Sequence, residues 1–159
     1  MESVDGGRWD RGPTSESATD IELLNRSVGY MLRRAQLAVF ADFGESLAGL
    51  GLRPAQFAVL SVLDRNPGVT QSRVCAALGI RHANFVSIIG SLERRGLVQR
   101  TSSATDRRSK SLTLTTAGRR ALDSASELQR THEMRIGQRL GPGGLVQLLR
   151  LLERLVESG

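Results

Sequence analysis

The strongest constraint on this chain is a change in the spacing of its apolar residues at Gly96. Before Gly96, three apolar residues recur at intervals of four and three, which is typical of one face of an α-helix. These residues are Phe85, Ile89 and Leu92. After Gly96, residues 97–101 and the alternating segment 110–115 predict two strands, and the small or charged residues 102–109 predict the hairpin tip between them. The sequence therefore predicts a helix that leads directly into a β-hairpin.

A shorter helix precedes this pair. Thr70 suits the N-cap of a helix over residues 71–78, and Gly79 suits the left-handed conformation that follows a helix end. The second helix is predicted from about Arg81 to Arg95. The residues expected to point inward from the first helix and the turn are Val74, Ala77, Leu78 and Ile80. Two short helices joined by a tight glycine turn predict a helix-turn-helix, and a hairpin directly after such a motif is a wing.

The face of the second helix opposite its apolar stripe carries mostly small or hydrogen-bonding side chains. These are Arg81, His82, Ala83, Asn84, Ser87 and Ser91. Small side chains let a helix approach the floor of a DNA groove, and Asn and Arg form bidentate hydrogen bonds with adenine and guanine. Recognition helices read base edges with their N-terminal half, so we expect residues 81–87 to contact DNA. The alternative is an ordinary solvated helix face.

The hairpin tip carries the basic side chains Arg107, Arg108 and Lys110. Arginine at such a tip suits the negative potential of a narrow minor groove. Asp106 does not suit a DNA surface, so we expect it to hold the Arg108 guanidinium in a fixed orientation.

Positive charge is concentrated in the same region. Residues 73–120 hold 10 basic and 2 acidic side chains, and the whole chain has a formal net charge of +6. A local basic excess is the electrostatic footprint of a nucleic-acid surface, although a solvated face has the same composition.

Helical patterns flank the predicted DNA-binding lobe on both sides. The apolar spacing over residues 21–47 predicts one helix of about 28 residues, which is about 42 Å long at the usual rise per residue. We interpret this helix as a dimerisation element; the alternative is a core helix broken at Gly29 or Gly44. A helix from about residue 117 and an amphipathic last helix over residues 145–156 follow the wing, separated by a break at residues 141–144.

The predicted fold is mainly α: a winged helix-turn-helix lobe with a two-stranded β wing, plus a helical dimerisation region from both termini. The predicted organisation is a mobile acidic tail, an N-terminal dimerisation helix, a DNA-binding lobe and C-terminal dimerisation helices. Their ranges are residues 1–19, 20–50, 53–116 and 117–157.

Composition and motifs argue against several other classes of protein. No catalytic fingerprint for a serine hydrolase, a zinc protease or a nucleotide-binding enzyme is found, so we expect no enzyme and no cofactor. Two His and one Cys are too few for the usual ligand set, so we expect no metal site. No apolar run is long enough for a transmembrane helix, and the N-terminus does not resemble a secretory signal, so we expect a cytoplasmic protein.

The wing region resembles that of the MarR family of bacterial transcriptional regulators. Asp106, Arg108, Leu112, Leu114 and Thr115 follow the pattern D-x-R-x-x-x-L-x-L-T, with Gly118 shortly after. The segment 92–98 with Arg100 resembles the family's junction between recognition helix and wing, and the order of elements matches over about residues 21–157.

The resemblance implies a homodimer that binds a roughly palindromic operator, and commonly a small effector between dimer and DNA lobes that releases the DNA. Carried over by position, residues 81–91 face the major groove and Arg108 enters the minor groove. Arg107 and Lys110 then lie near phosphates, and Arg73 on the first helix of the motif touches the DNA backbone.

Two kinds of signal are compatible with such a regulator. The first is a small organic effector: an aromatic carboxylate, a phenolic compound or a coenzyme A thioester. Candidate contacts are Tyr30, Arg33, Arg34, Phe40, Phe43 and His132, for which core or interface packing is the alternative. The second is oxidation of Cys75, which lies near Arg73 but equally suits a small buried apolar position.

Overall fold

A computed structural model describes residues 22–102 and 110–157, without the side chains of Ser102 and Lys110. The chain divides into two units, residues 1–36 and residues 37–159. The expected acidic tail, residues 1–19, lies outside the described residues.

The first unit contains α1 (Glu22–Asn25) and the beginning of α2 (Val28–Leu47), which continues into the second unit. The prediction of one unbroken helix over residues 21–47 was therefore wrong. The break lies at Arg26 and Ser27, and not at either glycine that the sequence suggested. Serine is favoured immediately before a first helical turn, and the Ser27 carbonyl accepts the first backbone bond of α2 from the amide of Met31 at 3.0 Å.

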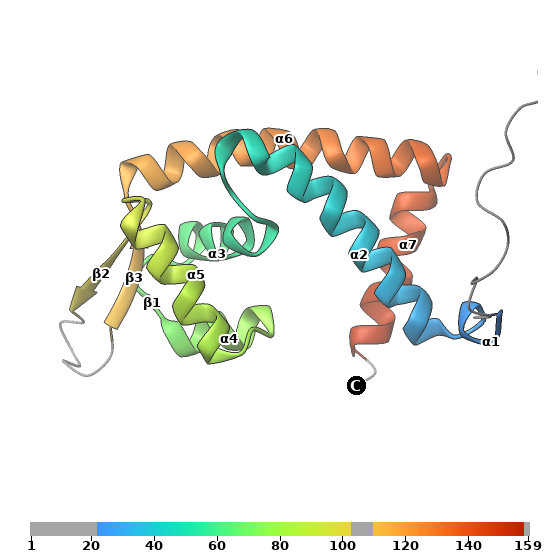
Figure 1. Ribbon diagram of the computed structural model, residues 1–159, viewed down its shortest axis with the longest axis horizontal. Coiled ribbons are helices and arrows are strands. Elements are labelled where there is room, and N and C mark those ends of the chain that lie inside the picture. The colour runs from blue at the N-terminus through green and yellow to red at the C-terminus, as the bar shows by residue number, and fades with distance from the viewer. Residues whose placement is uncertain (1–21, 103–109, 158–159) are drawn as a thin grey trace, which may run out of the picture. The chain divides into compact units, whose positions relative to one another are not determined.

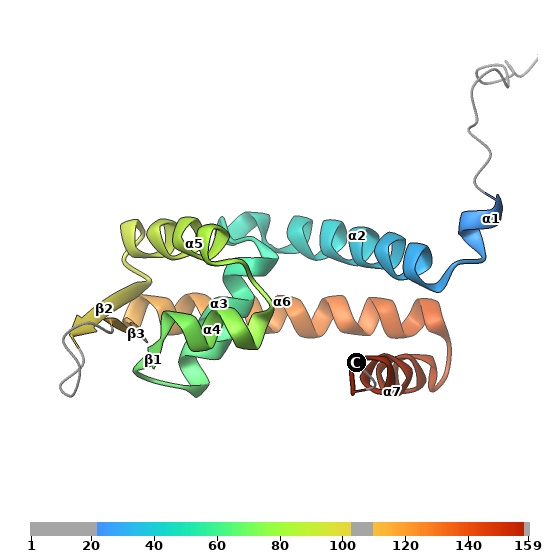
Figure 2. The same cartoon turned by 90° about the horizontal axis from the view of Figure 1, so that it is seen from below.

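The second unit continues with η1 (Ala48–Leu50), α3 (Pro54–Arg65), β1 (Val69–Thr70), α4 (Gln71–Leu78) and α5 (His82–Arg94). The wing strands β2 (Val98–Ser102) and β3 (Lys110–Leu114) follow, then α6 (Thr116–Leu140) and α7 (Gly144–Glu157). Figures 1 and 2 show α3, α4 and α5 gathered beside the strands, with the long α6 leading away from them past α3. The winged helix-turn-helix fold is confirmed.

The sheet has three strands in the order β1-β3-β2, one more than the sequence predicted. Val69 pairs with Leu112 and Thr70 with Ser111, so the segment before α4 is hydrogen-bonded to the wing. A strand of two residues is too short to show an alternating pattern, which is why sequence periodicity missed it.

One apolar core joins the helices to the wing. Its fully buried large side chains come from every part of the lobe: Leu47, Val59, Leu60, Leu63, Val74, Phe85, Ile89, Leu92 and Leu112. The expected inward stripe of α5 is thus confirmed. Ala77 was expected to point inward but is exposed, and Leu78 and Ile80 are only half-buried. Among the described residues no single helix is long and apolar enough to cross a membrane, and two bent helix pairs pass that test only with their lengths combined.

Candidate nucleic-acid interface

The helix-turn-helix is built around a three-residue turn, Gly79 to Arg81. Gly79 has φ 61°, a left-handed conformation that glycine adopts without steric cost. The amide of Ile80 donates to the carbonyl of Cys75 at 3.0 Å and closes the end of α4. The directions of α4 and α5 then differ by 114°. This angle lies in the range of about 90–120° typical of helix-turn-helix motifs.

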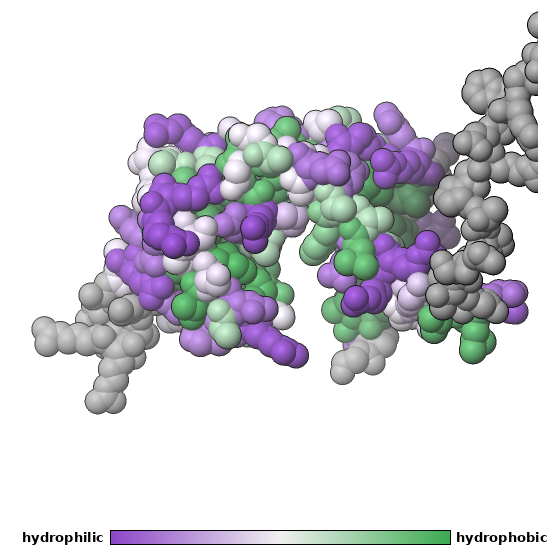
Figure 3. Space-filling model, viewed as in Figure 1, coloured by the Kyte–Doolittle hydropathy of each residue, from purple (hydrophilic) through white to green (hydrophobic). Residues whose placement is uncertain are grey.

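The N-terminal half of α5 carries the polar surface that the sequence predicted. Phe85, Ile89 and Leu92 are completely buried and set the orientation of the helix. Five of the predicted contact residues are exposed on its other sides: Arg81, His82, Ala83, Asn84 and Ser87. Val86 is also exposed, at 47%, which the sequence analysis overlooked although it lies off the buried stripe. In Figure 3, hydrophilic side chains cover the surface where α5 approaches the strands.

Ser91 departs from the expectation of an exposed position. It is half-buried, and its hydroxyl accepts a hydrogen bond from the Gln56 side-chain amide at 3.1 Å. Gln56 also accepts a bond from the Arg53 amide at 2.9 Å, at the start of α3. Ser91 therefore ties α5 to α3, and its hydroxyl is engaged inside the protein.

Two arginines that the sequence left without a role hold α5 against its neighbours. Arg95 donates to the carbonyls of Gly51 and Leu50 at 2.7 and 2.9 Å, just after η1. Arg100 on β2 forms an ion pair with Glu93 on α5 at 2.7 Å. Arg95 therefore connects the end of α5 to η1 and Gly51, and Arg100 connects the wing strand β2 to α5.

The base of the wing explains the residue pattern at the start of α6. Thr115 is the N-cap of α6, as predicted: its hydroxyl accepts from the Gly118 amide at 3.0 Å and donates to the Gly96 carbonyl at 2.6 Å. A Cβ on Gly118 would lie 2.0 Å from the Leu97 carbonyl oxygen, so only glycine fits there. Leu112 and Leu114 anchor β3 in the core.

The remaining predicted DNA contacts are described only in part. Arg73 is exposed on α4 and forms no ion pair with other described residues. The backbone of Lys110 begins β3 opposite Ser102, whereas Asp106, Arg107 and Arg108 lie outside the described residues. The roles of these wing residues stay predictions.

The candidate effector residues fall into two groups. In the first unit, Tyr30 is half-buried, Arg33 is exposed, and Arg34 lies over the Tyr30 ring at 5.9 Å. In the second unit, His132 is 2% exposed and stacks on Phe43 with ring centroids 5.1 Å apart. The Phe43 ring meets Phe57 edge-on at 5.4 Å.

The other two candidates for sensing differ in exposure. Phe40 is 53% exposed. Cys75 is half-buried against the apolar core, which agrees with the packing alternative for this residue. No group of three or more His, Cys, Asp or Glu residues that could hold a metal occurs in the described part of the chain.

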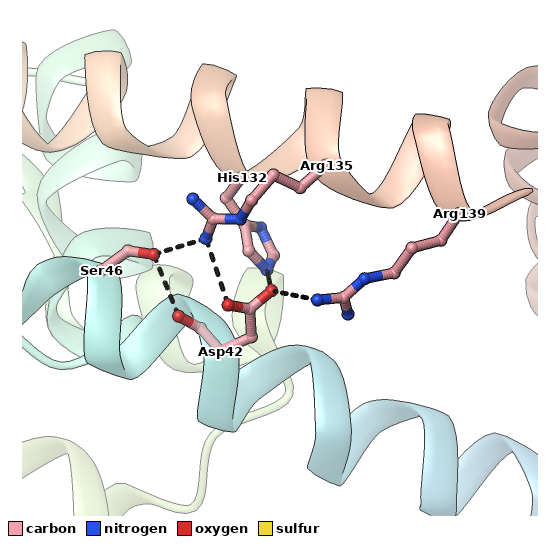
Figure 4. Close-up of polar contacts among 5 residues, drawn as sticks. All are labelled: Asp42, Ser46, His132, Arg135 and Arg139. Atoms are coloured by element: carbon pink, nitrogen blue, oxygen red, sulfur yellow. Dashed lines mark hydrogen bonds and ion pairs between the residues drawn. The ribbon is translucent and has the colours of Figure 1, made fainter.

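A polar cluster that the sequence did not indicate lies beside His132. Asp42 and Ser46 of α2 face His132, Arg135 and Arg139 of α6 (Figure 4). Arg135 Nη2 donates to Asp42 Oδ1 at 3.1 Å and to Ser46 Oγ at 2.8 Å. The spacing of the three α6 residues, three and four apart, could have shown that they share a helix face. Nothing local indicates that Asp42 opposes them.

Comparisons with known proteins agree with this geometry. A model described as MarR family matches residues 50–109. A protein of Thauera aromatica named as a transcriptional regulatory protein for its hcr operon is 32% identical over 129 residues, covering 80% of this chain and 78% of that protein.

Two solved structures of the transcriptional repressor CouR are also similar. CouR bound to a 23-mer DNA duplex has a TM-score of 0.82 and 44% identity, covering 88% of this chain and 99% of that one. CouR bound to p-coumaroyl-CoA has a TM-score of 0.80 and 41% identity, covering 86% and 96%.

Proposed function

Because the chain belongs to the MarR family of transcriptional regulators, which bind operator DNA as dimers, we propose that it is a repressor released from DNA by a small organic effector. The observation that carries this proposal is the similarity to CouR, a repressor solved both with a DNA duplex and with p-coumaroyl-CoA. A bacterial operator lies in the cytoplasm, so we expect the protein to act there.

The DNA-reading surface is the N-terminal half of α5. Asn84 is exposed and suits bidentate bonding to adenine, and Arg81 at the helix start suits guanine. The small side chains of Ala83 and Ser87 let the helix lie deep in the major groove. Val86 adds an apolar surface for a thymine methyl group. Ser91 is left out of this set because its hydroxyl bonds Gln56.

The wing and α4 supply contacts that position the protein. Arg108 enters the minor groove with its orientation set by Asp106, and Arg107 and Lys110 lie near phosphates. Arg73 on α4 is exposed and suits a contact with a phosphate of the DNA backbone. Phosphate contacts release counterions, so affinity falls steeply with salt concentration.

The dimer forms through the terminal helices, residues 20–50 and 117–157. α7 has no buried residue in the single chain, although more than half of its residues are Leu or Val. Its exposed large apolar residues are Val146, Leu148, Leu149, Leu151, Leu155 and Val156. Burying apolar surface contributes about 25 cal/mol per Å², so a second copy covering these residues stabilises both. The two recognition helices then read half-sites about one DNA turn, roughly 10 bp, apart.

The effector combines an aromatic group with an anion. Phe43 and His132 already form an aromatic stack in the second unit, and Phe40 on the same helix offers an exposed ring. Tyr30, Arg33 and Arg34 belong to the first unit and remain separate candidates for effector contacts. An aromatic carboxylate, a phenolic compound or a coenzyme A thioester fits this composition.

The test is a titration of the full chain against DNA from upstream of its own coding sequence, at two salt concentrations and beside a scrambled duplex. We expect selective binding that p-coumaroyl-CoA or p-coumarate reverses. Equal binding to both duplexes would contradict sequence-specific regulation from this site. Release only by an oxidant, with no release by either organic compound, would shift the proposal to Cys75.

A further inference from the structure

Among the described residues, Asp42 is the only carboxylate that forms ion pairs with the guanidinium groups of Arg135 and Arg139 (Figure 4). Its side chain is 25% exposed and lies on α2, whereas Arg135 and Arg139 project from α6. Arg139 Nη2 is 3.8 Å from Asp42 Oδ2, which is an ion pair without a hydrogen bond. The cluster therefore carries one more guanidinium than carboxylate, and attracts an anion.

The Asp42 carboxylate is only partly hydrogen-bonded, although two arginines lie beside it. Asp42 Oδ2 is buried and has no hydrogen-bond partner among the described residues, and the same is true of His132 Nε2. These two atoms are 3.6 Å apart, and the His132 side chain is only 3% exposed. Buried polar atoms without partners are costly, so the Asp42 carboxylate occupies this position at a cost in free energy.

The two arginines, in contrast, have N–H groups that donate to no other described residue. A guanidinium offers five N–H groups, and among the described residues Arg135 donates only through Nη2. Arg135 and Arg139 are 40% and 70% exposed, so a ligand can reach both. Ser46 Oγ also accepts from Arg135 and donates to the backbone carbonyl of Asp42. Ser46 therefore orients Arg135 independently of the Asp42 carboxylate.

We propose that Arg135 and Arg139 bind an oxyanion of the effector, a carboxylate or a phosphate, and that Asp42 is a resident competitor that this oxyanion displaces. The inference rests on the proposed function, because it assigns the anion-binding part of the effector site. An oxyanion that is not attached to α2 accepts bidentate bonds from the two guanidinium groups. The Asp42 carboxylate does not form such bidentate bonds. Binding thus exchanges an ion pair between α2 and α6 for contacts with the ligand.

Replacing Asp42 changes the affinity for an anionic ligand, and the direction of that change shows whether Asp42 competes with the ligand or helps to bind it. Asp42→Asn keeps the shape of the side chain but removes its charge. If Asp42 competes, this variant binds anionic ligands about two- to fivefold more tightly, the range expected from losing a partly exposed ion pair. If Asp42 merely orients the arginines, the same variant binds them more weakly.

The experiment measures binding to the full chain by calorimetry with three probes: p-coumarate, coenzyme A and p-coumaroyl-CoA. The first carries only a carboxylate and the second only phosphates, so their comparison identifies the oxyanion. We expect Arg139→Gln to weaken binding of the active probe about two- to fivefold. The matched control is Arg130→Gln, because Arg130 is also 70% exposed and paired with Glu127 on α6 but lies outside the cluster. We expect this control to match the wild type.

Unchanged or weaker binding by Asp42→Asn, or unchanged binding by Arg139→Gln, overturns the proposal. The proposed function survives that result when the wild type still binds a probe and releases DNA. If the wild type binds no probe at all, both proposals fail for this class of effector. Operator binding without ligand, measured for every variant, shows that each one is folded.

Discussion

Replacing each of two helical glycines by alanine should change the free energy of unfolding in opposite directions. Gly118 lies in the first turn of α6, and Gly90 lies within α5. A Cβ at Gly118 would lie 2.0 Å from the Leu97 carbonyl oxygen and 3.0 Å from the carbonyl carbon, whereas one at Gly90 would have no neighbour within 4 Å. Both obstructing atoms belong to the backbone, so no side-chain rotation relieves the clash at Gly118.

The cost at Gly118 has two parts. Moving α6 away from Leu97 by more than 1 Å is an overpacking effect of about 1–3 kcal/mol. The same movement strains the hydrogen bond from the Thr115 amide to the Leu97 carbonyl at 3.1 Å. This bond contributes about 0.5–1.5 kcal/mol. The better helix propensity of alanine offsets about 1 kcal/mol at most.

We therefore expect Gly118→Ala to lower the free energy of unfolding by about 1–4 kcal/mol, and Tm by roughly 2–16 °C for a chain of this size. Gly90→Ala should leave the free energy unchanged or raise it by up to about 1 kcal/mol. Thermal unfolding followed by circular dichroism, at one protein concentration for all variants, measures both. A Gly118→Ala protein that melts at or above the wild-type temperature would refute the close approach of α6 to Leu97.

Three further outcomes follow from the proposed function. Asn84→Ala should weaken operator binding by about 1–3 kcal/mol and relax specificity at one base pair, measured on operator variants; a uniform loss on all sequences would instead make Asn84 a phosphate contact. Leu149→Glu places a charge on an apolar side chain of α7 that is 49% exposed, so it should shift dimer to monomer in light scattering, and a wild-type mass would exclude this face from the interface. Cys75→Ser should keep both operator binding and release by the organic effector; loss of release in this variant alone would support the thiol alternative.

The local elements of the lobe could be read from the sequence. Thr70, Gly79 and Thr115 are residue types favoured at helix ends, and the structure ends or begins its helices beside them. The buried stripe of α5 follows from spacing alone. Ser27 carried a comparable signal, but the continuous apolar spacing around it concealed the break between α1 and α2. Ser91 was misplaced because its partner, Gln56, lies 35 residues away.

The sequence by itself determined most of the helices, the two wing strands and the buried face of α5, because these depend on residues only a few positions apart. Only the tertiary structure decided which side chains meet across elements. The bond between Asp42 and Arg135 joins residues 93 positions apart, and Arg95 reaches Gly51 across 44 positions. Likewise, the two-residue strand β1 exists only because β3 lies beside it. Such contacts depend on how whole helices and strands pack together. The spacing of apolar and polar residues along the chain does not predict that packing.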